Sequence, residues 1–208
     1  MNNITLLIII LTSIVSILAM SNSGLTDLLI YDNQKIIKKN QYYRLVTSGF
    51  VHSDWMHLLF NMLSFYFFGR YLEYFFVELY GFTIGILLYV GLYLTAIALS
   101  DIYPLLFKRN SHFFSLGASG GVSAVVFAFI LLSPLDKIYV FIFPIGIPGF
   151  IYGTLYLIYC SYAQGRYEKN VNHIAHLVGA VIGVLYLVAV FPMAVPNFFE
   201  QISGWSVF

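Results

Sequence analysis

Apolar residues run in six long stretches along the chain, separated by segments that carry most of its charge. A helix needs about 20 apolar residues to cross the hydrocarbon core of a bilayer, which is about 30 Å thick. We therefore predict six membrane-spanning helices, at residues 4–20, 56–74, 82–99, 118–132, 148–163 and 174–191. The first stretch lacks a positively charged start and a clear small-residue cleavage site, so a retained helix is favoured over a signal peptide.

Two connecting segments differ from simple turns. Residues 21–55 carry several lysines and aromatic side chains, and we expect a structured loop on the membrane surface. Residues 138–150 are apolar, but Pro144 and Pro148 would interrupt a helix, so this segment is predicted to be an interfacial turn or hairpin. No internal repeat or domain boundary is visible, and residues 1–208 are expected to form a single polytopic, all-α membrane domain.

The composition agrees with a membrane protein. Hydrophobic residues make up 60% of the chain, charged residues only 9%, and the mean hydropathy is +0.85. Such a chain has too little polar surface to cover a soluble globule. The net charge of +1 argues against a nucleic-acid partner, and the single cysteine, Cys160, excludes an internal disulfide and a CxxC metal site.

Polar side chains inside the predicted helices gather at one depth. Successive helices alternate in direction, so the second, fourth and sixth all begin on the same side of the membrane. His57 and Asn61 lie in the first turns of the second helix, Ser119 opens the fourth, and His176 lies in the first turn of the sixth. A lone serine in a membrane helix usually bonds its own backbone, whereas ionisable groups in lipid tend to mark function. The shared depth favours a functional site.

These residue types together suit nucleophilic catalysis. A serine becomes a nucleophile when a base removes its proton, and histidine is a natural base because its pKa lies near neutrality. Ser119 and His176 supply this pair. Backbone N–H groups at the start of the fourth helix, with the side chains of His57 and Asn61, could stabilise an oxyanion. Every Asp and Glu lies in a loop, a tail or near a helix end, so we predict a Ser-His dyad rather than a triad.

Small residues surround both members of the dyad. We assign packing roles to Gly117, Gly120, Gly179 and Gly183. Glycines beside the serine allow a substrate backbone to approach closely. Gly179 and Gly183 are expected to seat the sixth helix against Gly120 and Ala124 of the fourth, which would bring the base to the nucleophile.

Other intramembrane hydrolases fit the sequence less well. It contains no HExxH motif, and His173 and His176 lack an accompanying carboxylate, so we expect neither a metal nor another cofactor. No paired intramembrane aspartates support an aspartyl protease, and no lysine is placed to activate Ser119.

Three segments, HSDWMHLLFNMLSFYFFGRYLE, GASGG and NHIAHLVGAVIG, together resemble the rhomboid family of intramembrane serine proteases. The match extends over residues 43–187. The resemblance implies a six-helix bundle with a water-filled catalytic cavity open to one face. It also implies that Ser119 is the nucleophile and His176 the general base, with His57, Asn61 and the Ser119 N–H as oxyanion donors.

The resemblance extends to three further positions. Arg44, preceded by Tyr43, looks like the family's aromatic-Arg pair, and Glu73 resembles its helix-end glutamate; both roles are expected to be structural. One position departs from the family pattern. Rhomboids often carry an aromatic residue four positions after the nucleophile, stacked on the catalytic histidine, and this chain has Ser123 there. Either another aromatic holds the imidazole or the histidine is held more loosely.

The sequence thus predicts a serine endopeptidase that cleaves single-span transmembrane proteins near the membrane surface. The lipid bilayer and these substrates are the expected partners, and the plasma membrane is the expected location. Two alternatives remain: a catalytically inactive rhomboid-like protein that binds membrane clients, and a small transporter with broken, glycine-rich helices.

Two arguments about membrane orientation conflict. The resemblance implies a cytoplasmic amino terminus and a cavity open to the outside. Most lysines and arginines, however, lie in the first, third and fifth loops, which the positive-inside rule would place in the cytoplasm. We favour the outward cavity because lysines of the long first loop could bind lipid headgroups.

Overall fold

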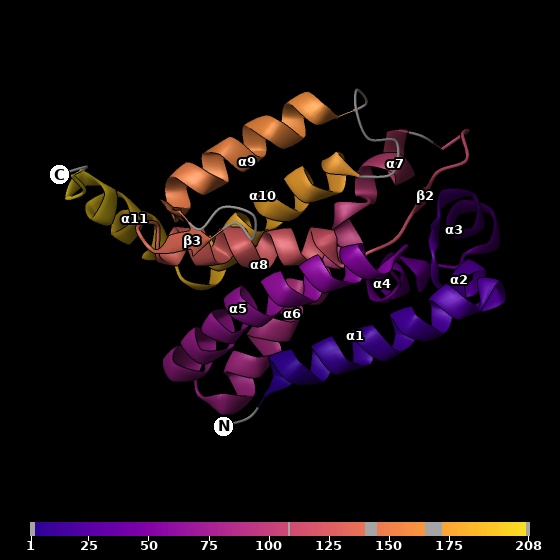
Figure 1. Ribbon diagram of the computed structural model, residues 1–208, viewed down its shortest axis with the longest axis horizontal. Coiled ribbons are helices and arrows are strands. Elements are labelled where there is room, and N and C mark those ends of the chain that lie inside the picture. Colours follow the sequence, from indigo (N-terminus) through magenta and orange to yellow (C-terminus); the bar gives the residue numbers. More distant parts are fainter. Residues whose placement is uncertain (1–2, 108, 140–144, 165–171, 207–208) are drawn as a thin grey trace.

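The computed structural model describes residues 3–107, 109–139, 145–164 and 172–206, and these are mostly helical (Figure 1). The helices in chain order are α1 (Ile4–Ser21), α2 (Ser23–Leu29), α3 (Asn33–Lys39), α4 (Arg44–Thr47), η1 (Ser48–Phe50), α5 (Trp55–Tyr80), α6 (Phe82–Ser100), α7 (Ile102–Phe107), α8 (Ser119–Leu132), α9 (Gly149–Ala163), α10 (His173–Val190) and α11 (Ala194–Ser203). The strands are β1 (Tyr31–Asp32), β2 (Phe114–Ser115), β3 (Lys137–Tyr139) and β4 (Gly146–Pro148).

Helix α8 is the centre of the bundle. It packs against α5, α6, α9 and α10, whereas α1 and α9 lie at opposite outer edges (Figure 1). Residues 120–131 are all buried, and they are apolar apart from Ser123, as expected of a helix enclosed on every side. Helix α1 instead exposes a row of large apolar side chains, among them Leu7, Leu11 and Leu18, which suits contact with lipid.

Helices α8 and α10 touch through their backbones. A Cβ atom at Gly179 would collide with the carbonyl oxygen of Gly120, and one at Gly183 would collide with that of Ala124. Small residues permit such close approach because no side chain separates the helices. The axial alignment of α8 and α10 is therefore fixed by main-chain contact.

Each of the six predicted apolar stretches corresponds to a helix, although α5 continues to Tyr80, beyond its predicted end. Near that end, the buried charge of Glu73 is compensated within the bundle, because its carboxylate accepts hydrogen bonds from the N–H groups of Ile4 and Thr5, each at 3.0 Å. Gly81, with φ of 77°, follows the last turn. Within the residues that the structure describes, three helical segments are long and apolar enough to cross a membrane, at Ile4–Ser21, Phe82–Phe107 and His173–Val190, and Ser119–Leu132 is a shorter apolar helix.

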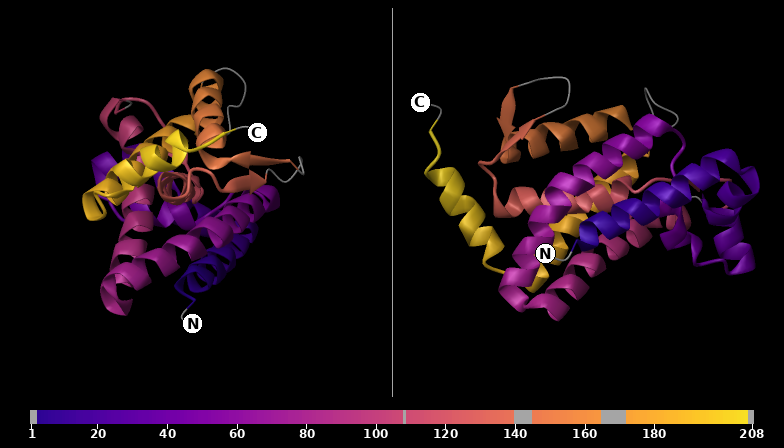
Figure 2. Two further views of the ribbon diagram at one scale, coloured as in Figure 1. Left: turned by 90° about the vertical axis from the view of Figure 1, so that its left-hand side faces the viewer. Right: turned by 60° about the horizontal axis from the view of Figure 1, so that its bottom comes forward.

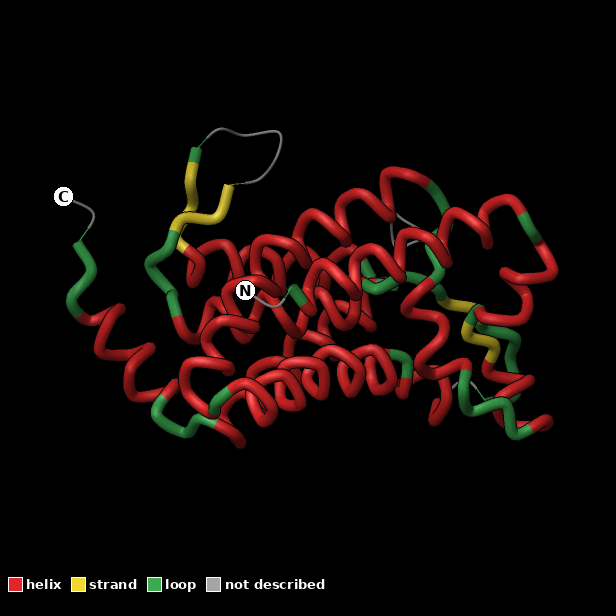
Figure 3. The backbone as a smooth tube through the Cα atoms, turned by 90° about the horizontal axis from the view of Figure 1, so that it is seen from below, coloured by secondary structure: helices red, strands yellow, loops and turns green. Residues whose placement is uncertain are grey.

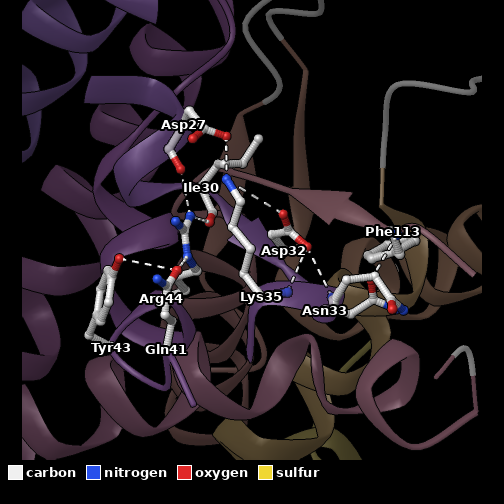
Figure 4. Close-up of polar contacts among 10 residues, drawn as sticks. Asp27, Ile30, Asp32, Asn33, Lys35, Gln41, Tyr43, Arg44 and Phe113 are labelled. Carbon is white, nitrogen blue, oxygen red and sulfur yellow. Dashed lines mark hydrogen bonds and ion pairs between the residues drawn. The ribbon is translucent and has the colours of Figure 1, made fainter. Parts of the chain in front are cut away.

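The segment before α5 is structured, as predicted. Buried Arg44 holds it together, because Nη1 donates to the carbonyl oxygens of Asp27 and Ile30, both at 2.7 Å, and Nε donates to Gln41 at 2.7 Å (Figure 4). The guanidinium also lies 5.4 Å from the centre of the Tyr43 ring. These contacts tie α4 to the end of α2.

The strands form two small antiparallel pairs at opposite ends of the bundle (Figure 3). β3 pairs with β4, which confirms a hairpin in the described part of the predicted segment; Pro144 lies outside the described residues. β1 pairs with β2 and joins the first loop to the segment before α8. This second pair was not predicted, nor was α11, which extends from the end of the bundle (Figure 2).

Candidate active site

One cavity, with a volume of approximately 1010 Å³, brings the four predicted residues together. His57 and Asn61 come from the start of α5, Ser119 from the start of α8, and His176 from the first turn of α10. The alternation of helix direction thus places these helix starts around one space, and Ser119, His57 and His176 are partly accessible in it.

A glycine turn positions Ser119 at the beginning of α8. Gly117 has φ of 115°, a conformation that disfavours any residue with a Cβ atom. A Cβ there would lie 2.6 Å from Cε1 and 2.7 Å from Nε2 of His57, so the imidazole covers this glycine directly. The N–H of Gly117 donates to the carbonyl oxygen of Ser48 at 2.9 Å, which fixes the turn.

Donors for a negative charge surround the start of α8. The Val122 N–H bonds the carbonyl oxygen of Ala118 at 2.9 Å, so the N–H groups of residues 119–121 precede the first helical hydrogen bond. They lie at the positive end of the helix dipole. Asn61 donates from Nδ2 to the carbonyl oxygen of His57 at 2.9 Å, and the second hydrogen of this amide leaves one donor for a ligand.

His176 is held by rings on both sides. The Tyr156 ring of α9 stacks on it, with centroids 6.2 Å apart and planes at 20°, and His173 meets it edge-on at 5.9 Å. Ser123 lies 3.4 Å from the Tyr156 hydroxyl. The aromatic group expected at position 123 is therefore supplied from α9, beside the serine that stands there.

Ser119 and His176 face the same cavity without a direct hydrogen bond in the part of the chain that the structure describes. Catalytic hydrogen bonds are often long in enzymes without substrate and shorten when substrate binds. Ser119 and His176 therefore share one cavity, and a hydrogen bond between them would require the shorter distance that bound substrate can bring about.

Sequence reasoning missed His52. It is buried, its Nε2 accepts the Ala118 N–H at 3.2 Å, and its Nδ1 lies 2.8 Å from Ser16 Oγ, which itself donates to the Phe50 carbonyl. Nδ1 therefore carries the proton and the ring is neutral. Burial lowers the pKa of His52 to about 3. This histidine links α1 to the turn that presents Ser119.

Sequence reasoning also missed an acidic group that supports the start of α10. Asp101 follows α6 and is buried, and its carboxylate accepts from Asn172 Nδ2 at 2.6 Å. Asn172 caps α10 by accepting the N–H of Ala175 at 3.1 Å. Asp101 thus positions the helix that carries His176 rather than bonding the imidazole. No spacing in the sequence relates these residues.

Three neighbouring side chains can ligate metal: His173 and His176, which line the cavity, and Cys160, which is buried behind them. The donor atoms of Cys160, His173 and His176 all lie within 4.8 Å of one another. The expectation of no metal rested on two histidines without a third ligand, and the structure adds the thiol of α9.

Comparisons with known proteins identify the family of the chain. A family model described as the rhomboid domain matches residues 39–193. Rhomboid-like protein 11, chloroplastic, from Arabidopsis thaliana is 29% identical over 191 residues, which cover 82% of this chain and 59% of that protein. Rhomboid protein 1, mitochondrial, from Saccharomyces cerevisiae is 31% identical over 144 residues, covering 68% of this chain and 40% of that protein.

A third relative, RHOMBOID-like protein 12, mitochondrial, from Arabidopsis thaliana, is 30% identical over 156 residues, covering 71% of this chain and 46% of that protein. The chain thus spans between 40% and 59% of the length of these relatives. The family match covers most of the helical bundle, including all the residues that line the cavity except Ile30. This chain is a multi-pass membrane protein that belongs to the rhomboid family.

Proposed function

We propose that this chain is an intramembrane serine endopeptidase with six membrane-spanning helices, α1, α5, α6, α8, α9 and α10. It cleaves single-span transmembrane proteins near the membrane surface. The observation that carries the proposal is the single cavity lined by Ser119, His176, His57 and Asn61, with the N-terminus of α8 in its wall. Nucleophile, base and oxyanion donors are the groups that acyl transfer needs.

The reaction follows from the roles of these groups. Ser119 Oγ attacks the scissile carbonyl carbon while His176 takes the hydroxyl proton, and the carbonyl oxygen becomes an oxyanion. The C–N bond then breaks, and His176 returns the proton to the leaving amine. A water molecule, deprotonated by the same imidazole, hydrolyses the resulting ester and restores Ser119.

Oxyanion stabilisation is divided between two helices. The Ser119 N–H at the start of α8 is one donor, and Asn61 and His57 of α5 supply side-chain donors. Gly117 keeps the His57 ring close to the nucleophile, since the imidazole occupies the space of the missing side chain. Removing one such donor typically costs about 10²–10³ in rate.

The substrate must present an extended bond to this cavity. A peptide bond inside a regular helix is shielded by its own hydrogen bonds, so the substrate helix has to unwind locally before attack. Residues with weak helix propensity near the scissile bond lower the cost of unwinding. We therefore propose transmembrane segments with small or helix-breaking residues as the substrate class.

Two other functions remain candidates with less support. An inactive rhomboid-like protein that binds clients has no need for a nucleophile and a base in one cavity. A transporter is expected to carry polar residues through the membrane midplane. In this chain Ser119, His57 and His176 all belong to helix starts, at one end of the bundle.

Labelling with a fluorophosphonate tests the proposal, because the reagent reacts only with an activated serine. We expect the purified protein to be labelled, and Ser119→Ala and His176→Ala to lose the label while remaining folded. Absence of label on the folded protein would favour the client-binding alternative. Co-expression with candidate single-span proteins, comparing the intact enzyme with Ser119→Ala, would then identify substrates.

Location and orientation are further parts of the proposal. We propose a plasma-membrane location with the cavity open to the outside. The three relatives are, by name, chloroplast or mitochondrial proteins. A single cysteine at exposed Lys38, in a Cys160→Ala background, reports the orientation in intact cells. Labelling by a membrane-impermeant maleimide supports the outward cavity, and labelling only after lysis contradicts it.

A further inference from the structure

A thiol and two imidazoles, one of them the proposed catalytic base His176, lie close together between α9 and α10. Cys160 is the only cysteine of the chain and is fully buried, on the side of α9 that also carries Tyr156, one helical turn earlier. His173 and His176 are three residues apart, which puts both on one side of α10. Helices α9 and α10 pack together, so the three side chains face a common point.

The geometry is close to that of a metal centre. Because the three donor atoms lie within 4.8 Å of one another, each lies at most about 2.8 Å from a common point. Zinc binds histidine nitrogen and cysteine sulfur at about 2.0–2.3 Å. A shift of less than about 1 Å by each donor, within the range of small rotamer changes, would satisfy all three bonds.

We propose that Cys160, His173 and His176 bind a zinc ion. Thiolate and imidazole are ligands of borderline and soft metals, and hard cations such as Mg²⁺ and Ca²⁺ prefer oxygen donors. Three ligands drawn from Cys and His, with a fourth position left to water, form an established type of zinc site. His173 and His176 also line the cavity, so water can approach the cluster from that side. The thiol proton leaves to solvent on binding.

Rings around the cluster support an ordered site. The Tyr159 ring meets His173 edge-on at 5.6 Å, and the Tyr156 ring stacks on His176 at 6.2 Å. These contacts limit the rotation of both imidazoles, so His173 and His176 are already ordered before a metal binds. Apolar and aromatic surroundings also strengthen charge interactions with a bound cation.

Metal binding at this position would inhibit the protease. This consequence rests on the proposed function, since it assumes that His176 is the base. A neutral imidazole has one nitrogen lone pair, and when that lone pair binds zinc the other ring nitrogen carries the proton, so the ring cannot accept the Ser119 proton. Zinc would therefore compete with catalysis for one side chain.

Cobalt absorption tests the site without any activity measurement. Co²⁺ replaces Zn²⁺ in such centres, and a cobalt–thiolate bond gives a charge-transfer band in the near ultraviolet. We expect the purified full chain in detergent to develop this band, Zn²⁺ to abolish it, and Mg²⁺ to leave it unchanged. No band at saturating Co²⁺ would overturn the proposal.

Variants assign the ligands. The band should disappear in Cys160→Ala and weaken in His173→Ala, with at least about a tenfold loss of metal affinity measured by competition. His112→Ala is the matched control, because His112 is an exposed histidine outside the cluster. An equal loss in His112→Ala would contradict the assignment. Thermal unfolding of each variant separates loss of a ligand from loss of fold.

Protease inhibition is the second, independent arm. Zinc should inhibit cleavage by the intact enzyme, and Cys160→Ala, which removes no catalytic group, should cleave normally without zinc and need at least about tenfold more zinc for half-inhibition. Inhibition equal in Cys160→Ala and the intact enzyme, or stimulation by zinc, would overturn the inhibitory role. A cobalt band in a protein that shows no cleavage would instead refute the proposed function and leave the metal site standing.

Discussion

Two polar clusters lie within this membrane bundle, and they use their polar atoms differently. In one, both oxygens of buried Glu73 are taken by α1: Oε1 accepts the Ile4 N–H at 3.0 Å, and Oε2 accepts the Thr5 N–H at 3.0 Å and its hydroxyl at 2.7 Å. Tyr89 lies 2.8 Å from the same hydroxyl. In the other, Ser119 and its partners line a cavity.

The comparison shows that an ionisable residue in a membrane helix is not by itself a sign of chemistry. Glu73 is costly to bury, but each of its two oxygens accepts a hydrogen bond from α1, so it stabilises the fold. The groups around Ser119 keep donors and acceptors facing open space. Substitutions in the Ser119 cluster should therefore lower the cleavage rate, whereas substitutions in the Glu73 cluster should lower the free energy of unfolding.

The largest effect is expected for Ser119→Ala. Removal of the nucleophile should reduce the rate of substrate cleavage by at least about 10⁴-fold without lowering the unfolding temperature. Initial rates on a purified single-span substrate measure this. Ser64→Ala, which removes another serine lining the same cavity, should retain activity. Near-normal cleavage by Ser119→Ala would remove the distinction between the clusters.

Gly117→Ala sharpens the comparison by moving a cavity group without deleting it. The new methyl would occupy the space of the His57 ring, and we expect kcat to fall by about 10²–10³, as for loss of an oxyanion donor. Gly81→Ala is the control, since Gly81 also has positive φ but no neighbour within 4 Å. It should lose only about 1 kcal/mol of stability and keep its activity. Equal kinetic losses in both variants would point to backbone strain.

Glu73→Ala tests the other cluster. It leaves two backbone N–H groups and a hydroxyl of α1 without their acceptor, which should lower the free energy of unfolding by about 3 kcal/mol. Below the unfolding temperature the cleavage rate should be retained. Denaturation in detergent measures the first quantity, with exposed Glu78→Ala on the same helix expected to change it by less than about 0.5 kcal/mol. A loss of rate without loss of stability would contradict a structural role.

The effect that is smallest at neutral pH concerns the protonation of His52. His52 has a lowered pKa of about 3 in the folded protein, against about 6.5 when unfolded, so only the unfolded state gains its proton as the pH falls below 6.5. Its contribution to stability is therefore complete above pH 6.5 and is lost progressively toward pH 3. The unfolding temperature should fall with pH more steeply in the intact protein than in His52→Gln. His57 and Asp54 face this ring and stay unchanged in both proteins, so identical pH profiles would contradict the assignment.

The six long helices could be predicted from the length of the apolar stretches. The meeting of His57, Asn61, Ser119 and His176 could be predicted because successive helices alternate in direction. The sequence could not predict that Tyr156 stacks on His176 or that Cys160 reaches His173, because α9 is apolar on all sides and its rotation depends on packing. His52 was also missed, since a single histidine in a loop carries no periodic signal. Helix α11 did carry a periodic signal in the sequence, because its apolar residues recur at helical spacing, at Val195, Phe198, Phe199 and Ile202.

The glycine contact between α8 and α10 has a consequence for redesign of this protein. Since main-chain atoms set the register of these two helices, point substitutions elsewhere have little leverage on the separation of Ser119 and His176. The opposite walls of the cavity, formed by α5 and α9, are built from side chains such as Phe60 and Tyr152. A library of variants at wall residues such as Phe60 and Tyr152 can therefore be screened for new substrate selectivity, because these changes leave the alignment of Ser119 and His176 in place.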